Sequence, residues 1–298
     1  MAQKKYKHRQ NKTVFLRSLI PFIMAIVFML AVQVAMIFVS AAGSGDSFAD
    51  AMAAYTENTA MNAQTSLICG IVLFVIFTIW YRIRFVRNDL YQQEGEQQGF
   101  SLPLILGLFI LAVGMYLICV FLLNGLEKAM PDLYAQYESL METQGDLGFD
   151  QESIMLLAYI VVLGPVAEEI IFRGLVFRLT NRTMGFWFAN IWQAALFGVY
   201  HLNVIQGIYA FVMGLFLGYI AYHGRSIRFS IYVHIAFNVL GIALESFFTG
   251  VSTMFPQAAF GIGCVLAAFA IFVFADEFHV LQKFREYRRE QRLAREEA

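Results

Sequence analysis

The apolar stretch from Gly164 to Gly174 contains two adjacent carboxylates, Glu168 and Glu169, and the cation Arg173. Its flanks are apolar enough to cross a membrane, where each ionisable group costs about 2.5 to 3.5 kcal/mol. Arg173 follows Glu169 by four residues, so both lie on one face of a helix and can form an ion pair. Glu168 points about 100° around the same helix. We therefore interpret Glu169 and Arg173 as a structural ion pair and Glu168 as the carboxylate that is free to act.

Gly164 and Pro165 immediately precede this group. Proline has no amide hydrogen and its ring crowds the preceding turn, so we expect it to break or kink the helix here. A new half-helix would then begin near Val166. Glu168 and Glu169 would lie in its first turn, where unpaired amides and the positive end of the helix dipole stabilise a carboxylate.

Two of the five histidines, His201 and His234, fall inside apolar segments. Phe197 precedes His201 by four residues and Asn238 follows His234 by four, so each pair shares a helix face. A lone histidine or asparagine in a membrane helix is commonly only an interhelical hydrogen-bond partner. The combination with Glu168 is what indicates a site, since few other strongly polar groups lie in apolar segments.

These side chains carry the groups that peptide hydrolysis requires. A glutamate can act as general base toward water, a histidine can hold that water or carry its proton, and a second histidine with an amide can stabilise an oxyanion. The sequence contains no persuasive serine nucleophile arrangement and no HExxH motif. Glu168, His201 and His234 could nonetheless bind zinc and leave one coordination position open. Both a metal-free site and a zinc site are compatible with these residue types.

The composition places the site in a membrane. Of the 298 residues, 59% are hydrophobic and 14% charged, and the mean hydropathy is +0.62. These values are typical of a polytopic membrane protein and exclude an ordinary soluble domain. Cys69, Cys119 and Cys264 each fall in an apolar segment without close pairwise spacing, which argues against a disulfide framework or a cysteine zinc site. We expect the lipid bilayer as a partner and no nucleic acid.

Eight apolar segments approach the length that crosses a bilayer, which predicts an all-α polytopic bundle of about eight spans with a Pro-broken helix carrying the two glutamates. The first segment is longer than the apolar part of a signal peptide, so we interpret it as a retained span. The spans are predicted at residues 19–42, 65–81, 102–123, 153–177, 186–204, 205–222, 227–248 and 258–274.

The loop charges predict the orientation. With the amino terminus in the cytoplasm, only Lys128 of the 21 Lys and Arg residues falls in an outer loop, which fits the positive-inside rule with both termini cytoplasmic. Short cytoplasmic loops and no organellar targeting sequence favour a bacterial plasma membrane. Apolar residues at helical spacing in 126–141 predict an amphipathic helix on the membrane surface. The tail 276–298 resembles a charged helix resting on anionic lipid.

Three motifs in this chain resemble the signature of the CAAX prenyl protease and bacteriocin-processing family of intramembrane proteases. That signature is Glu-Glu-x-x-x-Arg, then Phe-x-x-x-His, then His-x-x-x-Asn, on successive membrane helices. Here it reads Glu168 to Arg173, Phe197 to His201 and His234 to Asn238, in order and without departure. The resemblance covers about residues 153–248. It divides the single predicted domain into residues 1–152 with three spans, a catalytic core at 153–250, and 251–298 with the last span and basic tail.

The resemblance implies an intramembrane endopeptidase that cleaves a membrane-associated or CAAX-like peptide or protein. By this analogy Glu168 activates the attacking water with His201, while His234 and Asn238 form the oxyanion site. Glu169, Arg173 and Phe197 would support them. The family has been described both as metal-dependent and as glutamate-dependent without metal, so the cofactor is zinc or none. An asparagine four residues after a histidine suits an oxyanion site better than a zinc shell.

A non-catalytic membrane protein is the alternative. A transporter could use the broken helix and buried polar groups as an ion or solute site, and an immunity or scaffold protein could keep a protease-like fold. A transporter predicts a polar path to both faces and repeat symmetry, whereas the polar residues here cluster in the second half and no inverted repeat is apparent. Gly214 and Gly218, four residues apart, are interpreted as a helix-packing pair.

Overall fold

The structure is a computed structural model that describes residues 2–45, 47–86, 100–145 and 151–275, and every regular element in these ranges is a helix. Three of the helices, marked η, have π-helical hydrogen bonding. In chain order the elements are α1 (Ala2–Ser44), α2 (Phe48–Glu57), α3 (Thr59–Tyr81), η1 (Arg82–Val86), α4 (Leu102–Ala129), α5 (Pro131–Gly145), α6 (Gln151–Ala158), η3 (Tyr159–Leu163), α7 (Gly164–Glu169), η4 (Ile170–Phe177), α8 (Arg178–Met184), α9 (Phe186–Tyr200), α10 (Val204–His223), α11 (Ile227–Met254) and a last helix, Pro256–Ala275.

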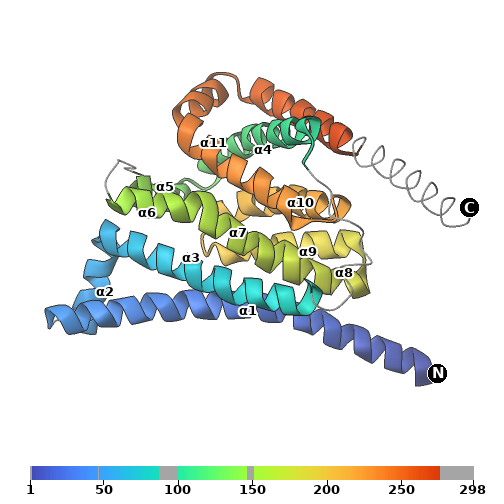
Figure 1. The fold of residues 1–298 in the computed structure, drawn as a ribbon. Helices are drawn as coiled ribbons and strands as arrows, with labels where there is room; N and C mark the ends of the chain where they lie inside the picture. Colours follow the sequence, from blue (N-terminus) through green and yellow to red (C-terminus); the bar gives the residue numbers. More distant parts are fainter. Residues whose placement is uncertain (1, 46, 87–99, 146–150, 276–298) are drawn as a thin grey trace, which may run out of the picture.

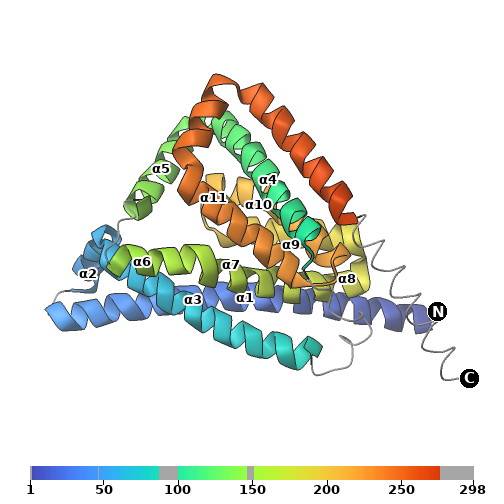
Figure 2. The ribbon, with the colours of Figure 1, turned by 45° about the horizontal axis from the view of Figure 1, so that its top comes forward.

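The elements from α6 to α8 form one rod through the middle of the molecule, with α1 and α3 along one side of it (Figure 1). The helices α9 and α10 form a hairpin that packs on the rod, and α11 crosses it at α7. Together α4, α11 and the last helix make a second layer that diverges from the rod (Figure 2). This arrangement surrounds α7, the segment with the two glutamates, by helices from distant parts of the sequence.

The predicted all-α polytopic bundle is confirmed, because each of the eight predicted spans coincides with a helix, although the span 186–204 runs past the end of α9 at Tyr200. In the described part of the chain, six helices are long and apolar enough to cross a membrane. The helix α9 has 15 residues, which at 1.5 Å per residue is about 22 Å and shorter than the roughly 30 Å hydrocarbon core. The apolar part of α11, Ile227–Ala243, is also short. Length therefore supports six of the eight spans.

Of the predicted break or kink at Pro165, the break is wrong, since the chain stays helical from Ser153 to Met184. Gly164 has helical dihedral angles of φ −58° and ψ −62°, and its N–H donates to the carbonyl of Tyr159, five residues back. This π turn leaves Pro165 inside a continuous rod, where its missing N–H removes one backbone hydrogen bond without ending the helix. The expected half-helix near Val166 is therefore absent, and no free helix terminus stabilises the glutamates.

Each of the two predicted outer loops contains a short helix. The predicted amphipathic helix is present as α5, but it begins at Pro131 because α4 continues to Ala129. Its Tyr137 ring packs on Tyr209 of α10, with centroids 6.3 Å apart. The short α2 was not predicted, although Ser47 caps it by accepting the N–H of Asp50. The predicted helix in the tail 276–298 lies outside the described residues.

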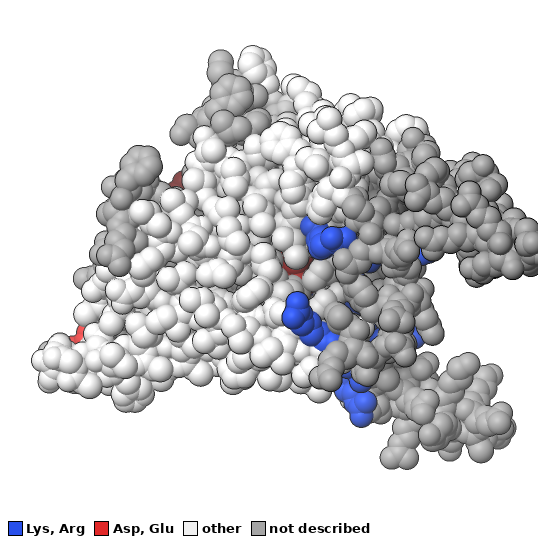
Figure 3. Space-filling model, viewed as in Figure 1, with Lys and Arg blue, Asp and Glu red and all other residues white. Residues whose placement is uncertain are grey.

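On the face drawn in Figure 3, the exposed cationic side chains lie toward one end of the molecule. Arginines follow α3 and α10 in the chain and lie in α8, and the first and last described helices reach one common end (Figures 1 and 2). The asymmetry follows from the loop charges read in the sequence. That this end faces the cytoplasm stays a prediction.

Candidate active site

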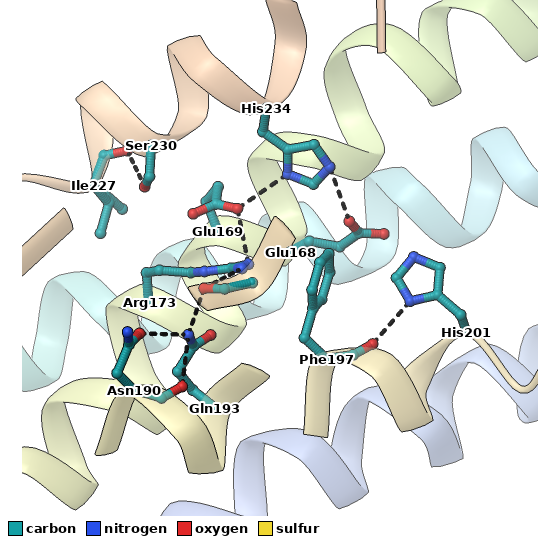
Figure 4. Close-up of polar contacts among 11 residues, drawn as sticks. Glu168, Glu169, Arg173, Asn190, Gln193, Phe197, His201, Ile227, Ser230 and His234 are labelled. Carbon is teal, nitrogen blue, oxygen red and sulfur yellow. Dashed lines mark hydrogen bonds and ion pairs between the residues drawn. The ribbon is translucent and has the colours of Figure 1, made fainter. Parts of the chain in front are cut away.

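Two histidines from different helices meet at one aromatic ring. Phe197 of α9 is fully buried, and its ring lies 4.8 Å from the His201 ring and 5.9 Å from the His234 ring, centroid to centroid. Both contacts are close to perpendicular, at 81° and 84°. Figure 4 shows the carboxylate of Glu168 between the two imidazoles. The structure thus brings together residues that are up to 66 positions apart in the sequence.

The predicted ion pair between Glu169 and Arg173 is confirmed. Nη1 of Arg173 lies 2.9 Å from Oε1 of Glu169, and both side chains are fully buried. Nη2 of Arg173 donates to the carbonyl of Gly214 at 3.4 Å, and the guanidinium carbon lies 4.4 Å from the centroid of Phe197. A carboxylate, a carbonyl and an aromatic face therefore surround the buried cation.

Glu169 also binds His234, which the sequence did not indicate. Nδ1 of His234 donates to Oε1 of Glu169 at 3.0 Å, so one carboxylate oxygen accepts from both the arginine and the histidine. This bond directs Nε2 of His234 toward Oε2 of Glu168, 3.7 Å away. That separation is too long for a hydrogen bond. Glu169 consequently orients the histidine as well as neutralising the arginine.

Glu168 differs from Glu169 in its surroundings. Its side chain is 13% exposed, and among the described residues it makes no hydrogen bond. The sequence-based division into one structural and one free carboxylate therefore agrees with the geometry. A carboxylate held near two imidazoles without a short partner has room to accept a proton from water.

His201 has a defined tautomer. The residue caps the end of α9, and its Nδ1 lies 2.8 Å from the carbonyl oxygen of Phe197. A carbonyl can only accept, so Nδ1 carries the hydrogen and Nε2 of the neutral ring is the acceptor. Nε2 is therefore the ring nitrogen of His201 that can bind water or substrate.

Asn238 binds the π turn. Its Nδ2 donates to the carbonyl of Ile160 at 2.8 Å. In π-helical register that carbonyl would accept from the N–H of residue 165, which is proline and has none. Asn238 therefore supplies the donor that Pro165 lacks. One of its two amide hydrogens is engaged in this way, and its oxyanion role stays a prediction.

A buried amide pair on α9 was missed by the sequence analysis. Nε2 of Gln193 donates to the carbonyl of Gly214 at 2.7 Å and lies 3.0 Å from Oδ1 of Asn190. Nδ2 of Asn190 donates to the carbonyl of Leu215 at 3.0 Å. The available signal was two carboxamides three residues apart in an apolar helix, opposite the glycine pair on α10.

The alternative zinc site of Glu168, His201 and His234 is not preformed in this arrangement. Within the described residues, no three His, Cys, Asp or Glu side chains are gathered as a metal ion would require. Both histidines use Nδ1 for bonds inside the protein and leave Nε2 open, as zinc-ligating histidines also do, so the choice between zinc and no cofactor stays a prediction. We therefore derive no step through a metal.

Residues 150–240 match the family model described as type II CAAX prenyl endopeptidase Rce1-like. This segment is less than half of the chain, and over it the chain is similar to that family. The Rce1-like segment contains all three motifs and the whole of α7, which carries Glu168 and Glu169. The first three predicted spans and the last helix lie outside it, and the three-part division of the chain stays a prediction.

A protein of Bacillus subtilis (strain 168), named "Putative membrane peptidase YdiL", is 24% identical to this chain over 103 residues. The aligned part covers 35% of this chain and 42% of that protein, so the likeness spans less than half of the relative. No solved structure matches the chain. The Rce1-like segment and this relative both connect the chain with membrane peptidases.

Proposed function

We propose that this protein is an intramembrane endopeptidase that hydrolyses a peptide bond of a membrane-associated or CAAX-like substrate. The observation that carries the proposal is the convergence of His201 and His234 on the buried ring of Phe197, with Oε2 of Glu168 3.7 Å from Nε2 of His234. Glu168 is the one member with no hydrogen bond in the described part of the chain. The Rce1-like match supports the substrate class, and the experiment described below identifies the scissile peptide.

In the proposed reaction, Glu168 removes a proton from a water molecule as the water oxygen attacks the carbonyl carbon of the substrate. Nε2 of His201 accepts a hydrogen bond from the second O–H of that water and aligns it, and this hydrogen stays on the attacking oxygen. Nε2–H of protonated His234 donates to the oxyanion, and the Glu169 carboxylate on Nδ1 balances its charge. When the carbon–nitrogen bond breaks, Glu168 returns the proton to the leaving amine.

The remaining predicted residues support this reaction. Arg173 holds Glu169, Phe197 separates and orients the two imidazoles, and the second amide hydrogen of Asn238 is the further donor that we propose for the oxyanion. This mechanism uses water and side chains alone, so we propose no cofactor. The proposed location is a bacterial plasma membrane with both termini in the cytoplasm.

The test compares membrane and secreted peptides from cells with the wild type and cells with Glu168→Gln at matched protein levels. The expected result is a set of new peptide termini that disappears in the variant, which also identifies the substrate. Glu138→Gln, an exposed glutamate on α5, is the matched control and should leave the termini in place. Identical peptide profiles in wild type and Glu168→Gln would contradict the proposal and favour a transporter or scaffold.

A further inference from the structure

The buried amides Asn190 and Gln193 lie behind Arg173, on the side away from His234 (Figure 4). Gln193 is fully buried and Asn190 is 5% exposed. Neither residue touches Glu168 or either histidine through any hydrogen bond of the described chain. The pair therefore has no direct part in the proposed reaction.

The orientation of the Gln193 amide is fixed by its neighbours. Nε2 faces three oxygens, the carbonyl of Gly214 at 2.7 Å, the carbonyl of Asn190 at 3.1 Å and Oδ1 of Asn190 at 3.0 Å. Oxygens of these kinds only accept, so the nitrogen and not the oxygen of Gln193 must point toward them. The shortest of the three bonds goes to Gly214.

The carbonyl of Gly214 connects this amide to the arginine. It accepts from Nε2 of Gln193 and from Nη2 of Arg173, the latter at 3.4 Å. Arg173 then binds Oε1 of Glu169 at 2.9 Å, and the same oxygen binds Nδ1 of His234 at 3.0 Å. A continuous series of hydrogen bonds thus runs from α9 through α10 and the rod to α11.

We propose that Gln193 is a positioning residue that acts on His234 through Gly214, Arg173 and Glu169. This inference rests on the proposed peptidase function. The contact with Phe197 does not fix the position of the Arg173 guanidinium, because a cation–π contact allows the cation to slide parallel to the ring. The Gly214 carbonyl, which Gln193 holds in place, fixes the position of Nη2 of Arg173. The position of Arg173 in turn fixes Oε1 of Glu169, the oxygen that orients the imidazole of His234.

The glycines of α10 provide the space for the amides. A Cβ atom at Gly218 would overlap Oδ1 of Asn190 and lie 2.6 Å from Nε2 of Gln193. A Cβ atom at Gly214 would lie 3.0 Å from the Cα of Ala194. The pair interpreted from sequence as helix packing therefore also admits two carboxamides between α9 and α10.

The test replaces Gln193 by methionine, which keeps the length of the side chain and removes the donor. Thr180→Val is the matched control, because the hydroxyl of the buried Thr180 binds, among the described residues, only the Val176 carbonyl of the same rod, at 2.9 Å. In detergent-solubilised full-length protein labelled with ¹⁵N-histidine, we expect the Nδ1–H resonance of His234 to shift in Gln193→Met and not in Thr180→Val. An unchanged resonance in Gln193→Met would overturn the proposal.

The resonance is measured without substrate, so it tests positioning even if the peptidase function fails. Once a substrate is identified, kcat should fall about tenfold or more in Gln193→Met with KM little changed. In the Arg173→Lys background the same replacement should cause no further loss, and independent losses in the double variant would contradict action through Arg173. If Gln193→Met does not accumulate, Gly218→Ala displaces the amide without removing it and should shift the same resonance.

Discussion

Replacing Asn238 by leucine should destabilise the protein, and replacing Pro165 by alanine should reverse much of that loss. The Asn238 amide occupies the Ile160 carbonyl, the acceptor that Pro165 leaves unpaired in the π turn. An orphaned carbonyl costs about 1–3 kcal/mol, and lipid offers no donor to replace the amide. Alanine at position 165 restores an N–H in the register that reaches Ile160. We therefore expect the double variant to lie within about 1 kcal/mol of the Pro165→Ala variant.

The native cysteines supply the assay. Cys69 and Cys119 are free and buried, so a thiol-reactive fluorescent dye reports unfolding of purified protein during heating, while the exposed Cys264 gives the starting signal. Pro165→Ala alone is the control. The reasoning is refuted if Asn238→Leu melts like the wild type, or if it loses as much stability in the Pro165→Ala background as in the wild-type background. A stable but inactive double variant would assign the second amide hydrogen to catalysis.

Three further outcomes follow from the structure. Arg173→Ala should lose about 3–5 kcal/mol and accumulate poorly, because the buried Glu169 loses the cation that neutralises it. The exposed Arg84→Ala is the control, and normal accumulation and activity of Arg173→Ala would contradict the ion pair. Gly114→Ala should lower the melting temperature, since its Cβ would lie 2.8 Å from backbone atoms of the last helix, whereas Gly125→Ala has open space. Peptidase activity should persist in EDTA or phenanthroline, and a loss reversed by zinc would show that a metal takes part.

The sequence predicted the pairing within each helix well. Residues four apart share a helix face whatever the fold, so Glu169 with Arg173 and Phe197 with His201 follow from spacing alone. The eight apolar segments were likewise visible, because bilayer thickness imposes their length. The family motifs added the expectation that three such pairs meet.

Contacts between helices could not be predicted in the same way. The bond from His234 to Glu169 joins residues 65 positions apart, and it depends on the crossing of α11 over the rod. The missed role of Gln193 has the same origin, since its acceptor is a backbone carbonyl of another helix, which carries no sequence signal. The error at Pro165 came from assuming α-helical register, in which proline is a strong breaker.

The π turn at Tyr159–Leu163 contains one residue more than an α-helical turn would need. Removing one residue there would rotate the two halves of the rod relative to each other by about 100°. The remaining side chains would still be apolar and suited to a membrane helix. The direction in which Glu168 and Glu169 project from the rod thus depends on the number of residues in the π turn as well as on their identity. Relatives that bury the same glutamate with a regular helix should align with a one-residue gap in this turn. A protein with one residue deleted here should still insert into a membrane, but its glutamates should no longer face His201 and His234.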